Sequence, residues 1–219
     1  MPVVHVSDQA GTLRDVMVAV NTGCEAAWLI DHDPRRDWRD LNEVYHLVRD
    51  SCPDLWIGLN YLDVRVTYAA GLTPAGVDGL WSDDLLPALT ESSRQALTDL
   101  REEQPMALFG SILFKGQPLP ATEKEELDWL QLTAALSSVV TISGSRTGKP
   151  PATDVVKFVA EQVTPKPLAL ASGVTAGNLA EFYRAGARHF LVASSLLDGS
   201  GHIIPARLQE LVACYRGLA

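Results

Sequence analysis

The chain has 219 residues, of which 47% are hydrophobic, and a formal net charge of -9 at pH 7. This length and composition allow a sizeable buried core. The negative charge argues against a nucleic-acid partner, because nucleic-acid binding depends on Lys and Arg side chains that neutralise phosphates.

The first residues, MPVVHVSDQAGT, lack the basic region and the long apolar core of a signal peptide. No later stretch contains the roughly eighteen uninterrupted apolar residues of a membrane span. The three cysteines lie far apart without a CxxC pairing, which indicates reduced thiols rather than a metal site. The sequence therefore predicts a cytoplasmic protein with no membrane span.

Short runs rich in β-branched and aromatic residues alternate with longer amphipathic segments along the whole chain. This alternation is typical of βα units around a parallel sheet. Eight strands are predicted, at Val3–Ser7, Ala26–Asp31, Leu55–Asn60, Gly79–Ser82, Met106–Phe114, Val139–Ser143, Leu168–Ala171 and His189–Ala193.

Each predicted strand is followed by a predicted helix. The eight helices are expected at Thr12–Asn21, Trp38–Arg49, Val64–Ala70, Glu91–Glu103, Thr122–Ser137, Thr153–Gln162, Ala176–Ala185 and Ala206–Tyr215. Eight strand–helix units predict a compact α/β protein, a (β/α)₈ TIM barrel that forms a single domain over residues 1–219.

A glycine recurs at the joins between helices and strands, in TGCEAAWLI, AGVDGLW and AGARHFLV. Glycine adopts positive φ without steric cost, so it can end a helix just before the next strand. The main alternative fold is an open doubly wound sheet, which would carry a glycine-rich fingerprint after its first strand. The first turn here is SDQAGT, with one glycine, whereas the glycine and hydroxyl clusters follow strands six to eight. That position favours the barrel, whose phosphate site commonly forms from its last loops.

In such a barrel the eight loops after the strands converge on one face, where active sites lie. The polar residues that the predicted strand ends bring to this face include His5, Asp31, Asp33, Asn60, Asp63, Asp83, Asp84, Lys115, Ser143, Ser172, Ser194 and Ser195.

The stretch ASGVTAGN is interpreted as one half of a phosphate-binding surface. Thr175 begins or caps a helix whose exposed N–H groups attract an anion, and Gly173 lets a ligand approach the backbone. The residues predicted for this surface, named the phosphate cup below, are Ser172, Gly173, Thr175, Asn178, Ser194 and Ser195. A tight turn followed by a helix cap is the alternative interpretation.

The stretch SGSRTGKPP invites comparison with a nucleotide-binding P-loop, but only three residues separate Gly144 from Gly148, and Pro150 follows Lys149. The stretch is instead predicted to form a pocket wall beside the phosphate cup. The residues predicted for this wall are Ser143, Gly144, Arg146, Thr147 and Gly148.

Lys115 ends an apolar run and could neutralise a phosphate, form a Schiff base or act as a base. His5 is a candidate general acid or base, or else a hydrogen-bonded core histidine. In IDHDP, Asp31 and Asp33 are expected to share one face of the strand while His32 points elsewhere. The two carboxylates could bind a metal or serve as loop caps.

Four stretches, WIGLNYLDV, FKGQPLP, SGSRTGKPP and ASGVTAGNLAEFY with FLVASSLL, resemble the BtpA family of TIM-barrel proteins, which is named after a photosystem I biogenesis factor. The resemblance implies a barrel with a site at His5, Asn60, Lys115, Gly144, Thr147, Gly148, Ser172, Gly173, Thr175, Asn178 and Ser195. The chain departs from the family pattern at SDQAGT, at DHDP and at Gly116.

The function predicted from these features is that of an enzyme of the BtpA-like type that binds a phosphorylated or phosphoribosyl small molecule. Lys115 and one acid among Asp31, Asp33 and Asp83 would then serve lyase, isomerase or glycosyl-transfer chemistry. The sequence requires no cofactor, although magnesium would suit phosphoribosyl transfer. The sequence is also compatible with a homo-oligomer. The alternative is a non-catalytic assembly or stability factor that uses the barrel as a binding scaffold.

Overall fold

A computed structural model of the chain describes residues 1–62, 64–83, 85, 91–103 and 105–218. Within these residues, eight parallel strands form one sheet in sequence order, and each strand pairs with the next. The strands are β1 Val3–His5, β2 Ala26–Ile30, β3 Trp56–Asn60, β4 Gly79–Ser82, β5 Ala107–Ser111, β6 Val139–Ile142, β7 Leu168–Leu170 and β8 Ala187–Phe190.

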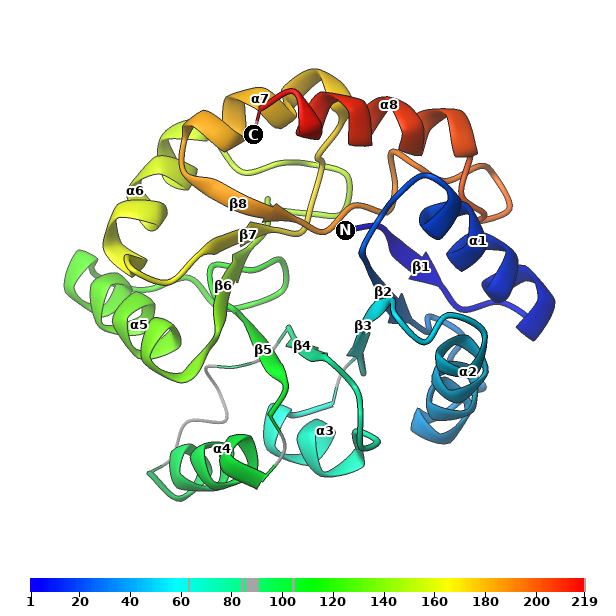
Figure 1. The fold of residues 1–219 in the computed structure, drawn as a ribbon. Helices are drawn as coiled ribbons and strands as arrows, with labels where there is room; N and C mark the ends of the chain where they lie inside the picture. Colours follow the sequence, from blue (N-terminus) through cyan, green and yellow to red (C-terminus); the bar gives the residue numbers. More distant parts are fainter. Residues whose placement is uncertain (63, 84, 86–90, 104, 219) are drawn as a thin grey trace.

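The sheet closes on itself between the first strand and the segment after the last one. Pro2 forms a parallel bridge with Val192, and the Val3 amide donates to the Val192 carbonyl at 2.8 Å. Figure 1 shows the resulting ring of strands with the helices around it. The predicted (β/α)₈ barrel is confirmed.

A helix follows each strand in the described part of the chain. The helices are α1 Gln9–Asn21, α2 Trp38–Ser51, α3 Val66–Leu72, α4 Glu91–Glu103, α5 Glu123–Leu136, α6 Thr153–Val163, α7 Ala176–Arg184 and α8 Pro205–Arg216. None of the helices in the described residues is both long enough and apolar enough to span a membrane.

Local sequence signals set several of these helix ends. Asp8 caps α1 by accepting from the Gly11 amide, and Asp37 caps α2 in a capping box with Asp40. The glycines at the helix-to-strand joins have positive φ, as expected: +81° at Gly23, +86° at Gly76 and +111° at Gly186. These joins let each helix end and the chain turn directly into the next strand.

The largest errors in the predicted strands are at the ends of β5 and β8, each predicted about three residues too late. β5 ends at Ser111 rather than at Phe114, because Leu113 adopts a φ of +50° that interrupts extended structure. β8 begins at Ala187 and ends at Phe190, although Leu191 still donates a backbone hydrogen bond to Leu170. The loops that carry Lys115 and the last two serines are therefore longer than predicted.

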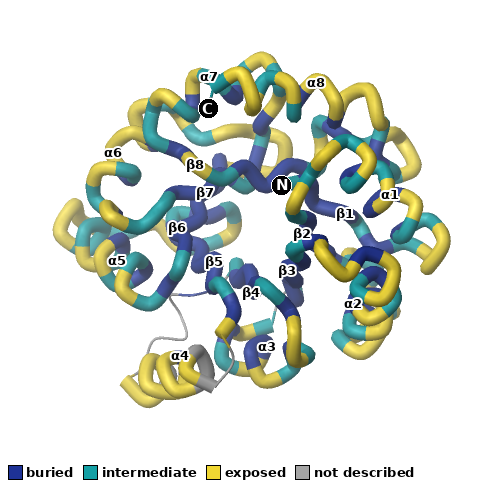
Figure 2. Tube along the Cα trace, in the orientation of Figure 1, coloured by how far each residue is buried: buried dark blue, intermediate teal, exposed yellow. Residues whose placement is uncertain are grey.

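The interior of the barrel is filled by aromatic side chains. Trp28 is fully buried, with its ring centroid 4.8 Å from that of Phe109 and 5.8 Å from that of Trp81. A Cβ on Gly58 would lie 2.3 Å from the Trp28 ring, so this position on β3 must be glycine for the indole to fit. Figure 2 shows the buried strands inside a ring of helices whose outer sides are exposed. The barrel is thus a packed core with its open space at the strand ends.

Candidate functional site

A pocket of about 330 Å³ opens among the carboxyl ends of the strands and the loops that follow them. Its walls come from the ends of the strands or the loops that follow them, with Leu62 as the contribution of the loop after β3. The polar residues and glycines that line it are His5, His32, Asp83, Lys115, Thr147, Gly148, Ser172, Gly173, Thr175, Ser194 and Ser195. A second cleft, of about 620 Å³, lies between α4 and α5 near the amino end of β5, away from this face.

The loop between β7 and α7 is held by a set of hydrogen bonds around the start of the helix. Thr175 is the N-cap residue, as predicted, and its amide donates to Asn178 Oδ1 at 2.8 Å. Asn178 Nδ2 donates to the Gly173 carbonyl at 2.9 Å, and Ser195 Oγ donates to the Val174 carbonyl at 2.7 Å. Asn178 and Ser195 therefore fix the shape of the predicted phosphate cup through its backbone.

The first amides of α7 are available to a ligand. Ala176 and Gly177 open the helix, so their N–H groups have no carbonyl partner inside it. These N–H groups and the helix dipole together favour an anion at this end of the helix.

Gly144 and Gly173 have a packing role that the sequence did not indicate. A Cβ on Gly144 would lie 2.0 Å from the Lys149 carbonyl oxygen, and one on Gly173 would lie 2.2 Å from the Pro150 nitrogen. The two glycines let the backbone at residues 149–150 pack between the loops after β6 and β7. Ser172 Oγ adds a hydrogen bond of 3.0 Å to the Arg146 carbonyl.

Lys115 reaches the pocket from the loop after β5. Its amide donates to Ser143 Oγ at 2.8 Å, and its Nζ donates to Thr147 Oγ1 at 3.1 Å. Lys115 Nζ also lies 5.7 Å from the centroid of the Phe114 ring. Ser143 is buried and supports this loop, so Ser143 acts behind the pocket wall rather than on its surface.

Two histidines stand together in the pocket. The rings of His5 and His32 meet edge to face, with their centroids 4.6 Å apart. Burial, followed by the charges of His32 and Lys115, lowers the pKa of His5 to about 4. Burial and the Lys115 charge also lower the pKa of His32. Both imidazoles are therefore neutral at pH 7 and can accept a proton.

Asp83 enters the pocket from the end of β4, across the barrel from the predicted phosphate cup. Its Oδ1 accepts from Asn60 Nδ2 at 3.1 Å, while Gln117 Nε2 donates to the Asp83 carbonyl at 2.7 Å. Asn60 is buried, does not line the pocket, and orients the Asp83 carboxylate. Asp63 and Asp84, the other acids expected near this edge, lie outside the described residues.

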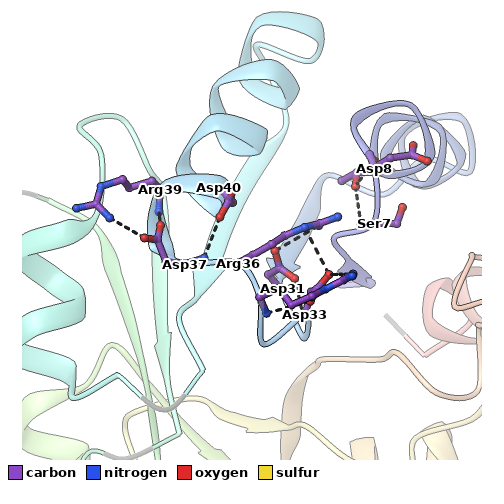
Figure 3. Close-up of polar contacts among 10 residues, drawn as sticks. Ser7, Asp8, Asp31, Asp33, Arg36, Asp37, Arg39 and Asp40 are labelled. Carbon is purple, nitrogen blue, oxygen red and sulfur yellow. Dashed lines mark hydrogen bonds and ion pairs between the residues drawn. The ribbon is translucent and has the colours of Figure 1, made fainter.

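Asp31 and Asp33 do not line the pocket, and arginines from the same loop pair with them (Figure 3). Arg36 Nη1 lies 3.4 Å from Asp31 Oδ2, and Arg35 donates to Asp33 through its amide and its guanidinium. The hydrogen bonds from Arg35 hold the pKa of Asp33 well below its ordinary value. Of the two roles weighed for these acids, the geometry supports loop capping. His32 points elsewhere, as expected, because its side chain lines the pocket whereas Asp31 and Asp33 do not.

The structure thus brings together only part of the predicted site. The predicted residues that line the pocket are His5, Asp83, Lys115, Thr147, Gly148, Ser172, Gly173, Thr175, Ser194 and Ser195. The predicted residues outside its lining are Asp31, Asp33, Asn60, Ser143, Gly144, Arg146 and Asn178. Arg146 is exposed, and its carbonyl accepts a hydrogen bond from Ser172 in the adjoining loop.

A buried contact that the sequence did not indicate joins the first helix to the last loop. Asp15 on α1 is fully buried, and its Oδ2 lies 2.9 Å from His202 Nδ1 in the loop before α8. Arg14 Nη2 donates a hydrogen bond to the other carboxylate oxygen, Asp15 Oδ1, at 2.9 Å. The contact fastens the loop that carries Ser194 and Ser195 to α1. The one signal in the sequence is that Asp15 is the single acidic residue of α1, next to the apolar run that begins at Val16.

Within the described residues, no group of three or more His, Cys, Asp or Glu side chains is arranged to hold a metal ion. The pocket groups suited to chemistry are the amine of Lys115, the two imidazoles and the carboxylate of Asp83. They can transfer protons, attack an electrophilic carbon or stabilise developing charge.

No protein-family model matches the chain, and no curated protein matches its sequence. Solved structures match its fold along nearly the whole length. Thiamine phosphate pyrophosphorylase from Pyrococcus furiosus is 12% identical with a TM-score of 0.69, and the match covers 99% of this chain and 95% of that one. For 3-hexulose-6-phosphate synthase the identity is 16%, the TM-score is 0.69 and the coverages are 97% and 98%.

Phosphoribosyl anthranilate isomerase from Thermus thermophilus is 17% identical with a TM-score of 0.64, and the match covers both chains completely. At these identities the similarity establishes only the fold, which is the TIM barrel. The reaction has to be inferred from the residues of the pocket.

Proposed function

We propose that this protein is an enzyme that binds a phosphorylated or phosphoribosyl small molecule at the carboxyl ends of its barrel strands. The phosphate would bind at the phosphate cup, against the first amides of α7 and the loop that carries Ser194 and Ser195. The reacting part of the substrate would lie against Lys115, His5, His32 and Asp83. Lyase, isomerase and glycosyl-transfer reactions all fit this set of groups.

The observation that carries this proposal is the composition of one pocket. The loop before α7, up to its N-cap residue Thr175, and the side chains of Lys115, His5 and Asp83 all border the same space of about 330 Å³. That volume suits a small metabolite. The names of the three solved structures reported above each contain a phosphate or phosphoribosyl group, which agrees with the proposal.

Membership of the BtpA-like type is part of the proposal and rests on the four sequence stretches quoted above. A cytoplasmic location also belongs to it, in agreement with the free thiols of Cys24, Cys52 and Cys214. If the reaction is phosphoribosyl transfer, magnesium would enter with the pyrophosphate of the substrate, and EDTA would abolish turnover.

The anion site can be tested with a pair of substitutions at Gly177. A Cβ there would approach no atom more closely than 3.7 Å, so both Gly177→Asp and Gly177→Asn fit the first turn of α7. Thermal unfolding is measured with and without inorganic phosphate and a panel of sugar phosphates. At a ligand concentration about 100 times Kd, the unmodified protein should gain about 2.7 kcal/mol of stability.

Gly177→Asn should keep this gain, whereas Gly177→Asp should lose most of it, because a carboxylate at the helix start competes with the anion. The proposal is wrong if no phosphorylated compound stabilises the unmodified protein, or if the two variants respond equally. The alternative, a non-catalytic assembly factor, predicts phosphate binding without turnover of any phosphorylated compound.

A further inference from the structure

We propose that Lys115 forms a Schiff base with the carbonyl carbon of a short phosphorylated ketone or aldehyde. This inference deepens the proposed function and rests on it for the phosphate end of the substrate. It narrows the substrate class from phosphorylated compounds in general to phosphorylated carbonyl compounds.

The first support is the environment of the Lys115 amine. In the described part of the chain, Nζ donates to one hydroxyl, Thr147 Oγ1, and forms no ion pair with a carboxylate. Lys124 shows the ordinary surface arrangement for comparison, since its Nζ is paired with Asp128. A lysine that only neutralises a phosphate can also be paired with a carboxylate. A nucleophilic amine must be able to lose its proton, which a paired carboxylate would oppose.

The second support is the set of apolar side chains around the Lys115 amine. The Phe114 ring lies beneath it, and the pocket walls include the apolar side chains of Ile30, Leu62 and Trp81. These apolar walls give the carbon atoms of a bound carbonyl compound a surface to pack against in the pocket that holds Nζ.

The third support is the link between the amine and the phosphate cup. Thr147 receives the Lys115 hydrogen bond, and the carbonyl of the preceding residue, Arg146, receives the Ser172 hydrogen bond at 3.0 Å. One loop thus connects the amine to the start of the cup. A carbonyl group placed at Lys115 would therefore belong to a short molecule whose phosphate sits at α7.

The fourth support is the pair of neutral imidazoles. Nζ attacks the carbonyl carbon as the C=O π pair moves to oxygen, and a proton passes from nitrogen to that oxygen. The resulting hydroxyl takes a second proton and leaves as water while the C=N bond forms. His5 and His32 line the same pocket and can carry these protons. The step consumes one proton, releases one water and needs no oxidant or reductant.

The test is reductive trapping on the whole protein. The protein is incubated with dihydroxyacetone phosphate, and separately with dihydroxyacetone, and each sample is treated with sodium borohydride. Intact mass spectrometry and peptide mapping then locate any adduct. The expected result is one reduced adduct per chain, on Lys115, formed at least tenfold faster with the phosphorylated ketone.

Lys149→Arg is the matched control, because Lys149 is an exposed lysine on the loop that borders the same pocket. Lys149→Arg should trap the adduct as the unmodified protein does, whereas Lys115→Arg should keep its phosphate-induced thermal shift and trap none. A phosphate-induced shift without trapping by a panel of phosphorylated ketones and aldehydes would overturn the Schiff base alone. Trapping at Lys115 that is equally fast with the unphosphorylated ketone would support the Schiff base and overturn the phosphate cup. Adducts spread over many lysines would overturn the special reactivity of Lys115.

Discussion

At the scale of single residues, the pocket combines one amine, one carboxylate and two imidazoles whose states depend on their surroundings. The clearest case is His5, which burial and neighbouring positive charge keep neutral. A neutral histidine in the folded protein that would be protonated in the unfolded chain links stability to pH.

The pKa of His5 is about 4 in the folded protein, against an ordinary value of 6.5. Between these values the unfolded chain binds more protons than the folded one, so acid favours unfolding. The contribution of His5 is fully present above pH 6.5, is lost as pH falls towards 4 and changes no further below that. The slope is at most about 1.4 kcal/mol per pH unit.

His5→Gln should therefore flatten the pH dependence of the free energy of unfolding between pH 4 and 6.5, measured by urea denaturation. His46→Gln provides the control, because His46 is an exposed histidine on α2. Parallel profiles for the unmodified protein and His5→Gln would show that His5 titrates normally.

The sequence placed Lys115 and Asp83 on the face where the strands end, and both line the pocket there, while their catalytic roles stay predictions. The sequence did not show which side chains would pair with one another inside a loop. Asp31 and Asp33 are paired with Arg36 and Arg35, and no strand pattern foretells which of several nearby charges will pair. His32 does point away from Asp31 and Asp33, but the strand pattern did not show that the imidazole, rather than the two carboxylates, faces the pocket.

At the scale of elements, the loops after β6 and β7 behave as one unit. Gly144 and Gly173 admit the backbone of residues 149–150, and the bond from Ser172 to the Arg146 carbonyl adds a second connection. The sequence predicted both loops in the site from their glycines and hydroxyls. It assigned Gly173 to ligand approach and Gly144 to the pocket wall. It did not reveal their contact with residues 149–150, because a pattern cannot show which backbone segments will meet.

Gly144→Ala should place a methyl group against the Lys149 carbonyl and force the loop after β6 to shift. We expect a loss of about 1–3 kcal/mol in the free energy of unfolding, together with weaker phosphate binding. Urea denaturation and phosphate titration measure the two effects. Gly71→Ala is the control, since a Cβ at this helical position meets no atom within 4 Å and should be neutral or mildly stabilising. Equal stability of the two variants would refute the packing role of Gly144.

At the scale of the whole molecule, alternation of strand and helix patterns was sufficient to predict the barrel. Eight repeats of one pattern make an error at any single boundary unimportant, so the shifted limits of β5 and β8 did not affect the fold. The contact between Asp15 and His202 could not be predicted, because residues 187 positions apart in the sequence meet only once the barrel closes.

The barrel has two clusters of buried hydrophobic side chains. One lies between the strands and the helices, and the second lies inside the ring of strands. Both clusters contain side chains of the same strands, so neither cluster can be exposed to water without disrupting the sheet. We expect the chain to unfold as one cooperative unit. Tryptophan fluorescence and far-ultraviolet circular dichroism should give the same urea midpoint, and two separate midpoints would indicate that part of the ring unfolds independently.

The position of Trp81 has a practical consequence. Its indole lines the pocket and donates to Ser111 Oγ at 3.1 Å, which fixes its orientation, while its ring contacts the inner cluster through Trp28. A ligand that enters the pocket replaces water beside this one indole and leaves Trp28 fully enclosed. Emission from the unlabelled protein can therefore serve as a built-in binding signal, and Trp81→Phe would show how much of that signal originates at the pocket.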